Sequence, residues 1–429
     1  MKDYQTSTAA APVPLPATVA LTVANLADEL QEGLLALAVG AGLQVLEAVL
    51  EHNVTGLAGE KGRHDPDRTA YRHGHEDGSV TLGGRRVPVR RPRVRAADGS
   101  GELALPAYAH FSATELLGRL AMEKMLAKIS TRRYAAGLEP VGQKVVAVAS
   151  ATSRSAVSRR FVEATEHALA ELLCKDLSDL DLVALLLDGV YFAEHLCLVA
   201  MGIGLDGRKH PLGLVEGSSE NTAVVTELLV GLRERGLDVS APLLVVVDGA
   251  KALSAGVRAV FDHPVFQRCQ LHKIRNVEAR LPKALAASIA KKMRAIYHYD
   301  DALAAEAELS ELARQLEKSH PGAAGSLREG LSETLTVMRL KVPPTLARTL
   351  RSTNAVESMI EICRDHASNV KRWRDGQMAL RWCAAGMGEA EKQFRKVNGF
   401  LHLPALRDAL VAYAERGVAP TEYNEEDAA

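Results

Sequence analysis

The sequence predicts an α/β fold in which a mixed sheet is flanked by helices, interrupted by an all-helical insertion and preceded by a mainly helical region. Three observations support this prediction. Between residues 181 and 276, short apolar runs of strand type alternate with turns and helical stretches. Residues 277–350 are rich in Ala, Leu, Glu and Lys and read as helix almost throughout. Hydrophobic residues make up 47% of the 429 residues and charged residues 24%, so the chain can bury a core.

Composition argues against several classes of protein. The net charge of −1 shows no overall basic excess, and 4% aromatic residues argue against a module that stacks single-stranded bases. The five cysteines are widely spaced and form no C-x-x-C pair. A disulfide framework or a zinc ribbon is therefore not expected, and a reducing cytoplasm is favoured. No apolar run reaches the roughly 18 residues of a membrane span, so no membrane association is expected.

The length suggests two to four structural units. Apolar positions recur at helical spacing from Leu26 to Leu50, after a Pro-interrupted start. Shifts in composition divide the chain into a disordered leader at 1–20, an N-terminal region at 21–175, the first part of the core at 181–276, the helical insertion at 277–350, the last part of the core at 351–415 and an acidic tail at 416–429.

Residues 61–95 are strongly basic, with ten Lys and Arg against four Asp and Glu. Alternating apolar residues on either side of Gly83-Gly84 predict a short hairpin that runs into a basic, Pro-containing arm. A solvated charged loop is the alternative, but the arginine content favours contact with phosphates. The candidate contacts are Arg85, Arg86, Arg90, Arg91, Arg93 and Arg95.

Residues 141–173 have the outline of a helix-turn-helix. A helix from Val141 to Ala149 is followed by a polar turn and by a second helix that starts at Arg154, with Ser153 as its N-cap. Arg154 and Arg159 are the candidate DNA contacts on that second helix. The alternative is a pair of helices that only pack together.

The segment 181–276 predicts the sheet. Three consecutive strands suggest a meander, and a helix then leads to a further buried strand, which gives a mixed sheet with helices packed on it. The expected strands are Val183–Leu187, Leu196–Ile203, Pro211–Val215, Leu243–Val247 and Val265–Cys269, with helices at Asn221–Arg235 and 250–261.

The two most apolar strands each end in Asp-Gly, at Asp188 and Asp248. If the strands are neighbours, the two carboxylates face each other and repel unless a cation lies between them. Hard oxygen ligands favour magnesium or manganese, and a pair of such ions can catalyse phosphoryl transfer. Glu357 is the best third carboxylate, although Asn354-x-x-Glu357 also has the form of a helix capping box.

Several short motifs follow one another in a specific order between about Ala70 and Gly399. They are Tyr71-Arg72-His73-Gly74, Arg86–Arg95, Ser130–Tyr134, Leu187-Asp188-Gly189-Val190, Val247-Asp248-Gly249, Gln267–Asn276, Ser352–Ser358 and Asn369–Arg374. In order and spacing the chain resembles the mutator-type transposases of bacterial insertion sequences, which belong to the DDE, RNase H-like group.

The resemblance implies an RNase H-like catalytic core in which Asp188, Asp248 and Glu357 form the DDE triad and bind Mg²⁺ or Mn²⁺, as two ions. It implies that the stretch between Asp248 and Glu357 holds the helical insertion. Cys269 and His272 match the C-x-x-H signature of the family. Two ligands do not make a zinc site, so we expect this pair beside the active site in a structural or DNA-positioning role.

The resemblance further implies a DNA transposase that binds terminal inverted repeats through its N-terminal region, cuts at the element ends and joins the freed 3′-hydroxyl to target DNA. Double-stranded DNA is the expected partner, with a homodimer on that DNA and a nucleoid location in the bacterial cytoplasm. Residues 339–396 carry twelve basic against six acidic residues, and Lys371, Arg372 and Arg374 are expected to contact phosphates.

Two alternatives stay open. Another RNase H-like metal nuclease, such as an exonuclease or a Holliday-junction resolvase, would share the carboxylates but would not need two basic regions and a long insertion. A catalytically inactive DNA-binding regulator, such as a decayed transposase, is the second, and an intact set of carboxylates is only weak evidence against it.

Overall fold

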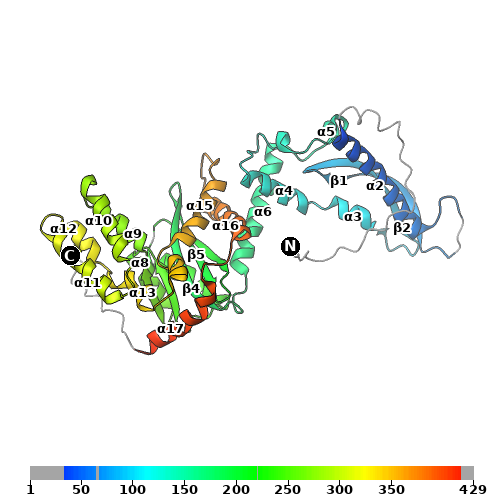
Figure 1. Cartoon of the computed structure of the whole chain (residues 1–429). Helices are drawn as coiled ribbons and strands as arrows, with labels where there is room; N and C mark the ends of the chain where they lie inside the picture. Colours follow the sequence, from blue (N-terminus) through cyan, green and yellow to red (C-terminus); the bar gives the residue numbers. More distant parts are fainter. Residues whose placement is uncertain (1–32, 64–66, 220, 417–429) are drawn as a thin grey trace. The chain divides into compact units, whose positions relative to one another are not determined.

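A computed structural model describes residues 33–63, 67–219 and 221–416 of the protein (Figure 1). The expected leader at 1–20 and all but the first residue of the expected acidic tail at 416–429 lie outside these ranges. The chain forms two compact units, one extending to Ala164 and the other beginning at Thr165. Helix α6 (Arg154–Cys174) runs through this boundary.

The N-terminal unit combines helices with a three-stranded sheet of order β1-β2-β3. Its long helix α2 extends eight residues beyond the predicted end at Leu50, and the glycines within it do not interrupt it. The bounds are α2 (Leu34–Ala58), β1 (Ala70–Leu82), β2 (Arg85–Ala96), β3 (Glu102–Leu103), α3 (Pro106–Ser112), α4 (Glu115–Leu126), a short 3-10 turn at Ala135–Gly137, and α5 (Gln143–Val148).

By length and composition alone, α2 could cross a membrane. Its apolar side chains Leu46, Val49, Leu50 and Val54 are buried in a cluster with side chains from β1 and β2. Packing against the sheet therefore accounts for the apolar character of this face of the helix.

The predicted hairpin is present but longer than expected. Gly83 and Gly84 both have positive φ, at 52° and 78°, as a two-residue type I′ turn requires. The prediction that a basic arm follows the hairpin is wrong, because those residues are the second strand, paired with β1 as far as Ala96 opposite Ala70. Pro88 and Pro92 fit because β3 pairs only with Val94 and Arg95, which leaves that edge of β2 open beside them.

The predicted helix-turn-helix is tied to this hairpin. Helix α5 has only six residues, and Ser150 in the turn forms an isolated antiparallel bridge with Arg86 at the start of β2. Ser153 caps α6 as predicted, since its Oγ accepts a hydrogen bond from the backbone N–H of Ala156 at 3.3 Å. The turn therefore belongs to the sheet as much as to the helix pair.

The second unit is built on a mixed five-stranded sheet of order β6-β5-β4-β7-β8, which confirms the predicted meander and the predicted mixed sheet. Strands β6, β5 and β4 are antiparallel neighbours, whereas β4, β7 and β8 run parallel. The bounds are β4 (Leu182–Phe192), β5 (His195–Gly204), β6 (Lys209–Gly217), α7 (Thr222–Glu234), β7 (Leu243–Val247), α8 (Lys251–Val260) and β8 (Pro264–Arg268).

Helices cover both faces of this sheet. Leu185 and Leu187 of β4 are buried in one core cluster with side chains of α7 and α8. Successive strand residues point to opposite faces, so Leu186 and Asp188 point the other way. Helices α15 (Asn354–His366) and α16 (Gly376–Gln393) lie beside β4, β5 and β6 (Figure 1). The face that carries Asp188 is thus the face available to α15.

Residues 277–350, all of which the structure describes, contain no strand, as predicted. The insertion has its own apolar core, which is shared with α9. The helices are α9 (Gln270–Glu278), α10 (Lys283–Ile296), α11 (Ala302–Glu317), α12 (Pro321–Arg328), the 3-10 helix η2 (Ser332–Leu335), α13 (Thr336–Arg339) and α14 (Pro344–Leu350); α17 (Leu403–Glu415) follows α16 after a 3-10 turn at Phe400–His402.

The insertion also covers the edge strand β8. The buried side chain of Gln267 donates to the carbonyl of Thr334 at 2.9 Å and accepts from the N–H of Val337 at 2.8 Å. Lys273 on α9 donates to the carbonyls of Ser326 and Glu329, and burial lowers its pKa to about 8. These buried hydrogen bonds fix the insertion to β8 and α9.

Close packing of α15 on α16 gives a test of this arrangement. A Cβ on Gly386 would lie 2.8 Å from the backbone Cα of Cys363, whereas a Cβ on the exposed Gly388 in the same helix would meet nothing within 4 Å. Both substitutions to Ala gain the same helix propensity, so their difference isolates the clash. We expect Gly386→Ala to be less stable than Gly388→Ala by about 1–3 kcal/mol in denaturant unfolding. Equal stabilities would contradict the packing described here.

Candidate active site

Two adjacent parallel strands bring the two aspartates together. The pairing of β4 with β7 ends at Leu186 opposite Val246, and Asp188 and Asp248 each lie two residues further on. Neighbouring strands lie about 4.8 Å apart, so the two side chains arise from neighbouring positions. The sequence analysis places the two carboxylates opposite each other only if the two strands are neighbours. The sheet meets this condition, since β4 pairs with β7.

The prediction that Asp188-Gly189 ends its strand is wrong. Strand β4 continues to Phe192, and Asp188 pairs with Val199 in the antiparallel ladder with β5. The physical reason is that β4 keeps one partner after losing the other, since β7 stops at Val247 while β5 continues. Asp248 does follow the last residue of its strand, and its Oδ1 accepts a hydrogen bond from Ala250 N–H at 2.8 Å.

The surroundings of the Asp188 carboxyl disfavour its charged form. Its pKa is raised to about 6, with burial as the largest cause; the charges of Asp248 and Glu357 also raise the pKa, whereas the Gly189 N–H and His272 lower it. Mutual repulsion of gathered carboxylates is relieved when a cation binds between them.

Glu357 approaches the aspartates from helix α15. The N-cap of this helix is Thr353, one residue earlier than the capping box would need. The carboxylate of Glu357 accepts a hydrogen bond from the hydroxyl of Thr353 at 2.6 Å. The capping box between Asn354 and Glu357 is therefore not formed. The Glu357 side chain is half-buried, and its carboxylate oxygens lie 3.8 Å from His272 Nδ1 and 3.9 Å from Arg275 Nη1.

Cys269 and His272 lie directly beside Glu357. Cys269 is buried between β8 and α9, and its Sγ accepts from His272 N–H at 3.5 Å. Burial alone would raise the pKa of the Cys269 thiol, but hydrogen bonds from His272 and Thr353 outweigh it and lower the pKa. The hydrogen bond with Cys269 is the main cause that raises the pKa of His272 to about 8.

Donor atoms of Cys269, His272 and Glu357 lie within 4.8 Å of one another, a spacing that could suit a metal ion. The Thr353 hydroxyl, however, lies 3.4 Å from Cys269 Sγ and 3.3 Å from His272 Nδ1, besides its bond to Glu357. It occupies the space that the three donors surround, so hydrogen bonds hold this cluster together. Mg²⁺ and Mn²⁺ prefer oxygen ligands, and the carboxylates of Asp188, Asp248 and Glu357 offer that type of donor.

The basic residues predicted near the site lie in the loop between α15 and α16. Lys371, Arg372 and Arg374 are exposed, and Arg374 forms an ion pair with Asp375 at 2.8 Å. Trp373 anchors the loop, since its ring lies 4.8 Å from that of Phe192 on β4. Phe192 is four residues after Asp188, a distance of about 13 Å along a strand.

The predicted arginines of the N-terminal unit fall into two groups. Arg91 and Arg93 both form ion pairs with Glu76 and Glu102, Arg86 donates to the carbonyl of Ser112 at 2.6 Å, and Arg85 is buried. The side chains left exposed are Arg90 and Arg95 on β2 and Arg154 and Arg159 on α6.

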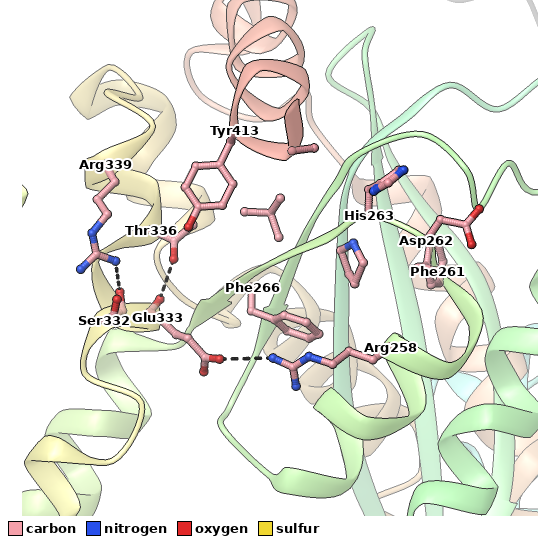
Figure 2. A pocket seen from close by; sticks show the side chains of 13 residues that line it. Arg258, Phe261, Asp262, His263, Phe266, Ser332, Glu333, Thr336, Arg339 and Tyr413 are labelled. Atoms are coloured by element: carbon pink, nitrogen blue, oxygen red, sulfur yellow. Dashed lines mark hydrogen bonds and ion pairs between the residues drawn. The ribbon is translucent and has the colours of Figure 1, made fainter. Parts of the chain in front are cut away.

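A cavity of about 360 Å³ lies in the second unit (Figure 2). Its lining comes from α8, β8, η2, α13 and α17, and Figure 2 shows Glu333 linked to Arg258 on one side and to Thr336 on the other. None of the three carboxylates lines it. The cavity is thus a feature of the covered sheet edge, apart from the candidate active site.

Two residues around Glu357 were missed from the sequence. Thr353 appeared only as part of the motif Ser352–Ser358, and Arg275 only as part of Gln267–Asn276. The spacing of His272 and Arg275, three residues apart on a helix, was a usable signal, because it places both on one face.

Comparisons with known proteins identify the family of the chain. The family model described as "Transposase, Mutator family" matches residues 19–397. The chain is 27% identical over 371 residues to the transposase for insertion sequence element ISRM5 of Rhizobium meliloti (strain 1021), a match that covers 85% of this chain and 89% of the relative. It is 29% identical over 273 residues to the transposase for IS6120 of Mycolicibacterium smegmatis, covering 62% and 83% of the two chains.

A third relative is the transposase for IS256 in transposon Tn4001 of Staphylococcus aureus, at 26% identity over 307 residues, covering 68% of this chain and 74% of the relative. The family model extends from the N-terminal unit through the sheet and the insertion to the helix that follows Glu357. The chain therefore belongs to the Mutator family of transposases.

Proposed function

We propose that the protein binds the terminal inverted repeats of an insertion sequence and cuts and joins DNA strands at Asp188, Asp248 and Glu357. The observation that carries the proposal is the convergence of three carboxylates from two adjacent strands and a helix packed on the same sheet. The same mixed sheet, flanked by helices, supports an RNase H-like core. A nucleoid location in the bacterial cytoplasm is part of the proposal.

The carboxylates act by holding Mg²⁺ or Mn²⁺, as two ions. When bound, such ions supply activation of a water or hydroxyl nucleophile and stabilisation of the leaving oxygen. Asp188 and Asp248 are fixed by their strands, and Glu357 is held by Thr353. Cleavage by water and attack by a 3′-hydroxyl are both in-line displacements at phosphorus, so one set of carboxylates serves both steps.

Exposed basic residues orient the DNA. Lys371, Arg372 and Arg374 lie in a loop that Trp373 fixes near the end of β4, and there they bind phosphates beside the reacting bond. Arg90 and Arg95 bind the phosphates of the element ends, and Arg154 and Arg159 reach base edges. The protein acts as a homodimer that holds two element ends.

The direct test uses the purified chain with labelled duplexes carrying the DNA that flanks its reading frame, and scrambled duplexes as the control. We expect nicking at the element end and, with a pre-cut 3′-hydroxyl end, joined products that require Mg²⁺ or Mn²⁺ and vanish in EDTA. Cleavage of element-end and scrambled duplexes alike, with no joined product, would favour the alternative of another metal nuclease. End binding without either reaction would favour the inactive regulator.

A further inference from the structure

We infer that Thr353 and Cys269 are positioning residues that fix the carboxylate of Glu357 relative to Asp248, through a chain of hydrogen bonds between β7, α9 and α15. The inference rests on the proposed function, because it concerns how the third metal-binding carboxylate is held.

Cys269 is the junction of three elements. Its N–H donates to the carbonyl of Val247 at 2.7 Å, and Val247 is the residue directly before Asp248. Its Sγ accepts from the N–H of His272 at the start of α9 and from the N–H of Thr353 at the start of α15, each at 3.5 Å. One wholly buried side chain therefore joins the strand end that carries Asp248 to the helix that carries Glu357.

Sulfur suits this junction because of its size. Both helix ends present unpaired N–H groups that need an acceptor, and a sulfur atom reaches two of them at 3.5 Å. A serine oxygen, on a shorter bond to Cβ, would not span both distances. A second bond, from Gln270 N–H to the carbonyl of Arg351 at 3.0 Å, holds the same two helices in register.

Thr353 carries the link from this junction to the carboxylate. Its hydroxyl has one proton and three polar neighbours: His272 Nδ1 at 3.3 Å, Cys269 Sγ at 3.4 Å and Glu357 Oε1 at 2.6 Å. The carboxylate is the nearest of these groups and is charged, so it accepts the hydrogen bond from the Thr353 hydroxyl. The N–H of Glu357 in turn donates to the carbonyl of Thr353 at 2.9 Å, which fixes the backbone that bears the carboxylate.

Among the described residues, the Thr353 hydroxyl makes the only side-chain hydrogen bond that reaches the Glu357 carboxylate. His272 Nδ1 and Arg275 Nη1 lie 3.8 and 3.9 Å from its oxygens, beyond normal hydrogen-bond length. Thr353 is fully buried, so water does not take the place of its hydroxyl at that position. Loss of the hydroxyl leaves Glu357 free to change rotamer, which lowers the population of the metal-binding arrangement.

The test compares Thr353→Val, which keeps the shape and removes the hydroxyl, with Thr353→Ser, which keeps the hydroxyl. Mn²⁺ binding to the full chain without DNA is followed by electron paramagnetic resonance of the free ion. We expect Thr353→Val to raise the Kd for Mn²⁺ by roughly 10–100-fold, as for other groups that orient a metal ligand, and Thr353→Ser to bind as the wild type does.

Strand transfer gives the second readout. Thr353→Val should need a correspondingly higher Mn²⁺ concentration and recover activity when the ion is in excess, which a loss of fold would not allow. If Thr353→Val does not fold, Cys269→Ser takes its place, with the same expected rise in Kd. Thermal unfolding of each variant checks the fold.

The variant Glu357→Gln separates the two proposals. If it weakens Mn²⁺ binding while Thr353→Val and Cys269→Ser bind as the wild type does, the positioning role is wrong and the carboxylate site stands. If Glu357→Gln itself binds Mn²⁺ as the wild type does, the proposed metal site is wrong, and the positioning role is overturned with it.

Discussion

Asp188→Asn, Asp248→Asn and Glu357→Gln are each expected to abolish cleavage and strand transfer while leaving binding to the element ends in place. Each change keeps the shape of the side chain and removes a charge that binds the metal ion. Substitution of a group that merely orients a ligand costs about 10–100-fold, so loss of the ligand itself should cost more than about 100-fold. The measurement is the rate of product formation on labelled element ends.

Two matched controls lie on the same elements or close to them. Glu361→Gln removes an exposed carboxylate one turn after Glu357 on α15, and Asp179→Asn removes an exposed carboxylate shortly before β4. Both should retain wild-type rates. Near wild-type cleavage by Asp188→Asn, Asp248→Asn or Glu357→Gln would remove that residue from the proposed triad.

The same variants have an expected effect on stability. Burial of Asp188 beside Asp248 and Glu357 disfavours its charged form, as its raised pKa indicates. An amide carries no charge to desolvate, so Asp188→Asn in EDTA should unfold at the wild-type temperature or above it. A marked loss of stability would mean that inactivity reports misfolding.

The second large effect concerns DNA affinity. Replacing Arg90 and Arg95 together with Gln should weaken binding to every duplex and make the log–log dependence of affinity on salt less steep by about 1.8, since each lost phosphate contact contributes about 0.9. Both side chains are exposed on β2. Anisotropy titrations at several salt concentrations measure the slope.

The matched control is the pair Arg91→Gln and Arg93→Gln. It removes the same charge from the same strand, but these arginines are engaged with Glu76 and Glu102. We expect the salt slope of the folded protein to stay close to that of the wild type, and the unfolding temperature to fall. An equal change of slope in both double variants would show that net charge alone governs binding.

Much of the second unit could be predicted from its sequence because its signals are local. Buried strands read as short apolar runs, and the insertion reads as helix throughout, so the sheet segments and the strand-free stretch 277–350 were found. The predicted end of β4 was too early because the length of a strand depends on its partner. Pairing with β5 extends β4 beyond its apolar run, as far as Phe192.

The N-terminal unit was harder to predict for a related reason. Arginine and proline in residues 85–96 look unlike a strand, and only the pairing with β1, with Glu76 and Glu102 supplying counter-charges, makes that segment extended. Ion pairs between distant residues have no periodicity in the sequence. Which arginines stay exposed could therefore not be foreseen.

In the candidate active site, too, some residues have a local sequence signal and others depend on the fold. The positions of Asp188, Asp248 and Glu357 were chosen from strand runs and from the family resemblance, but the role of the Thr353 hydroxyl depends on a fold that brings β7, α9 and α15 to one point. A threonine at a helix start has an ordinary capping explanation, so nothing in the linear pattern marks it.

The long helical insertion also sets the order in which the protein gains its parts during synthesis. Asp248 and Glu357 are 109 positions apart, so at the usual rate of translation Glu357 leaves the ribosome roughly 5–20 seconds after Asp248. The N-terminal unit is complete well before that time. On the proposed function, a growing chain can hold DNA before it can cut it, and a chain that stops early would occupy element ends as a competitor of the full-length protein.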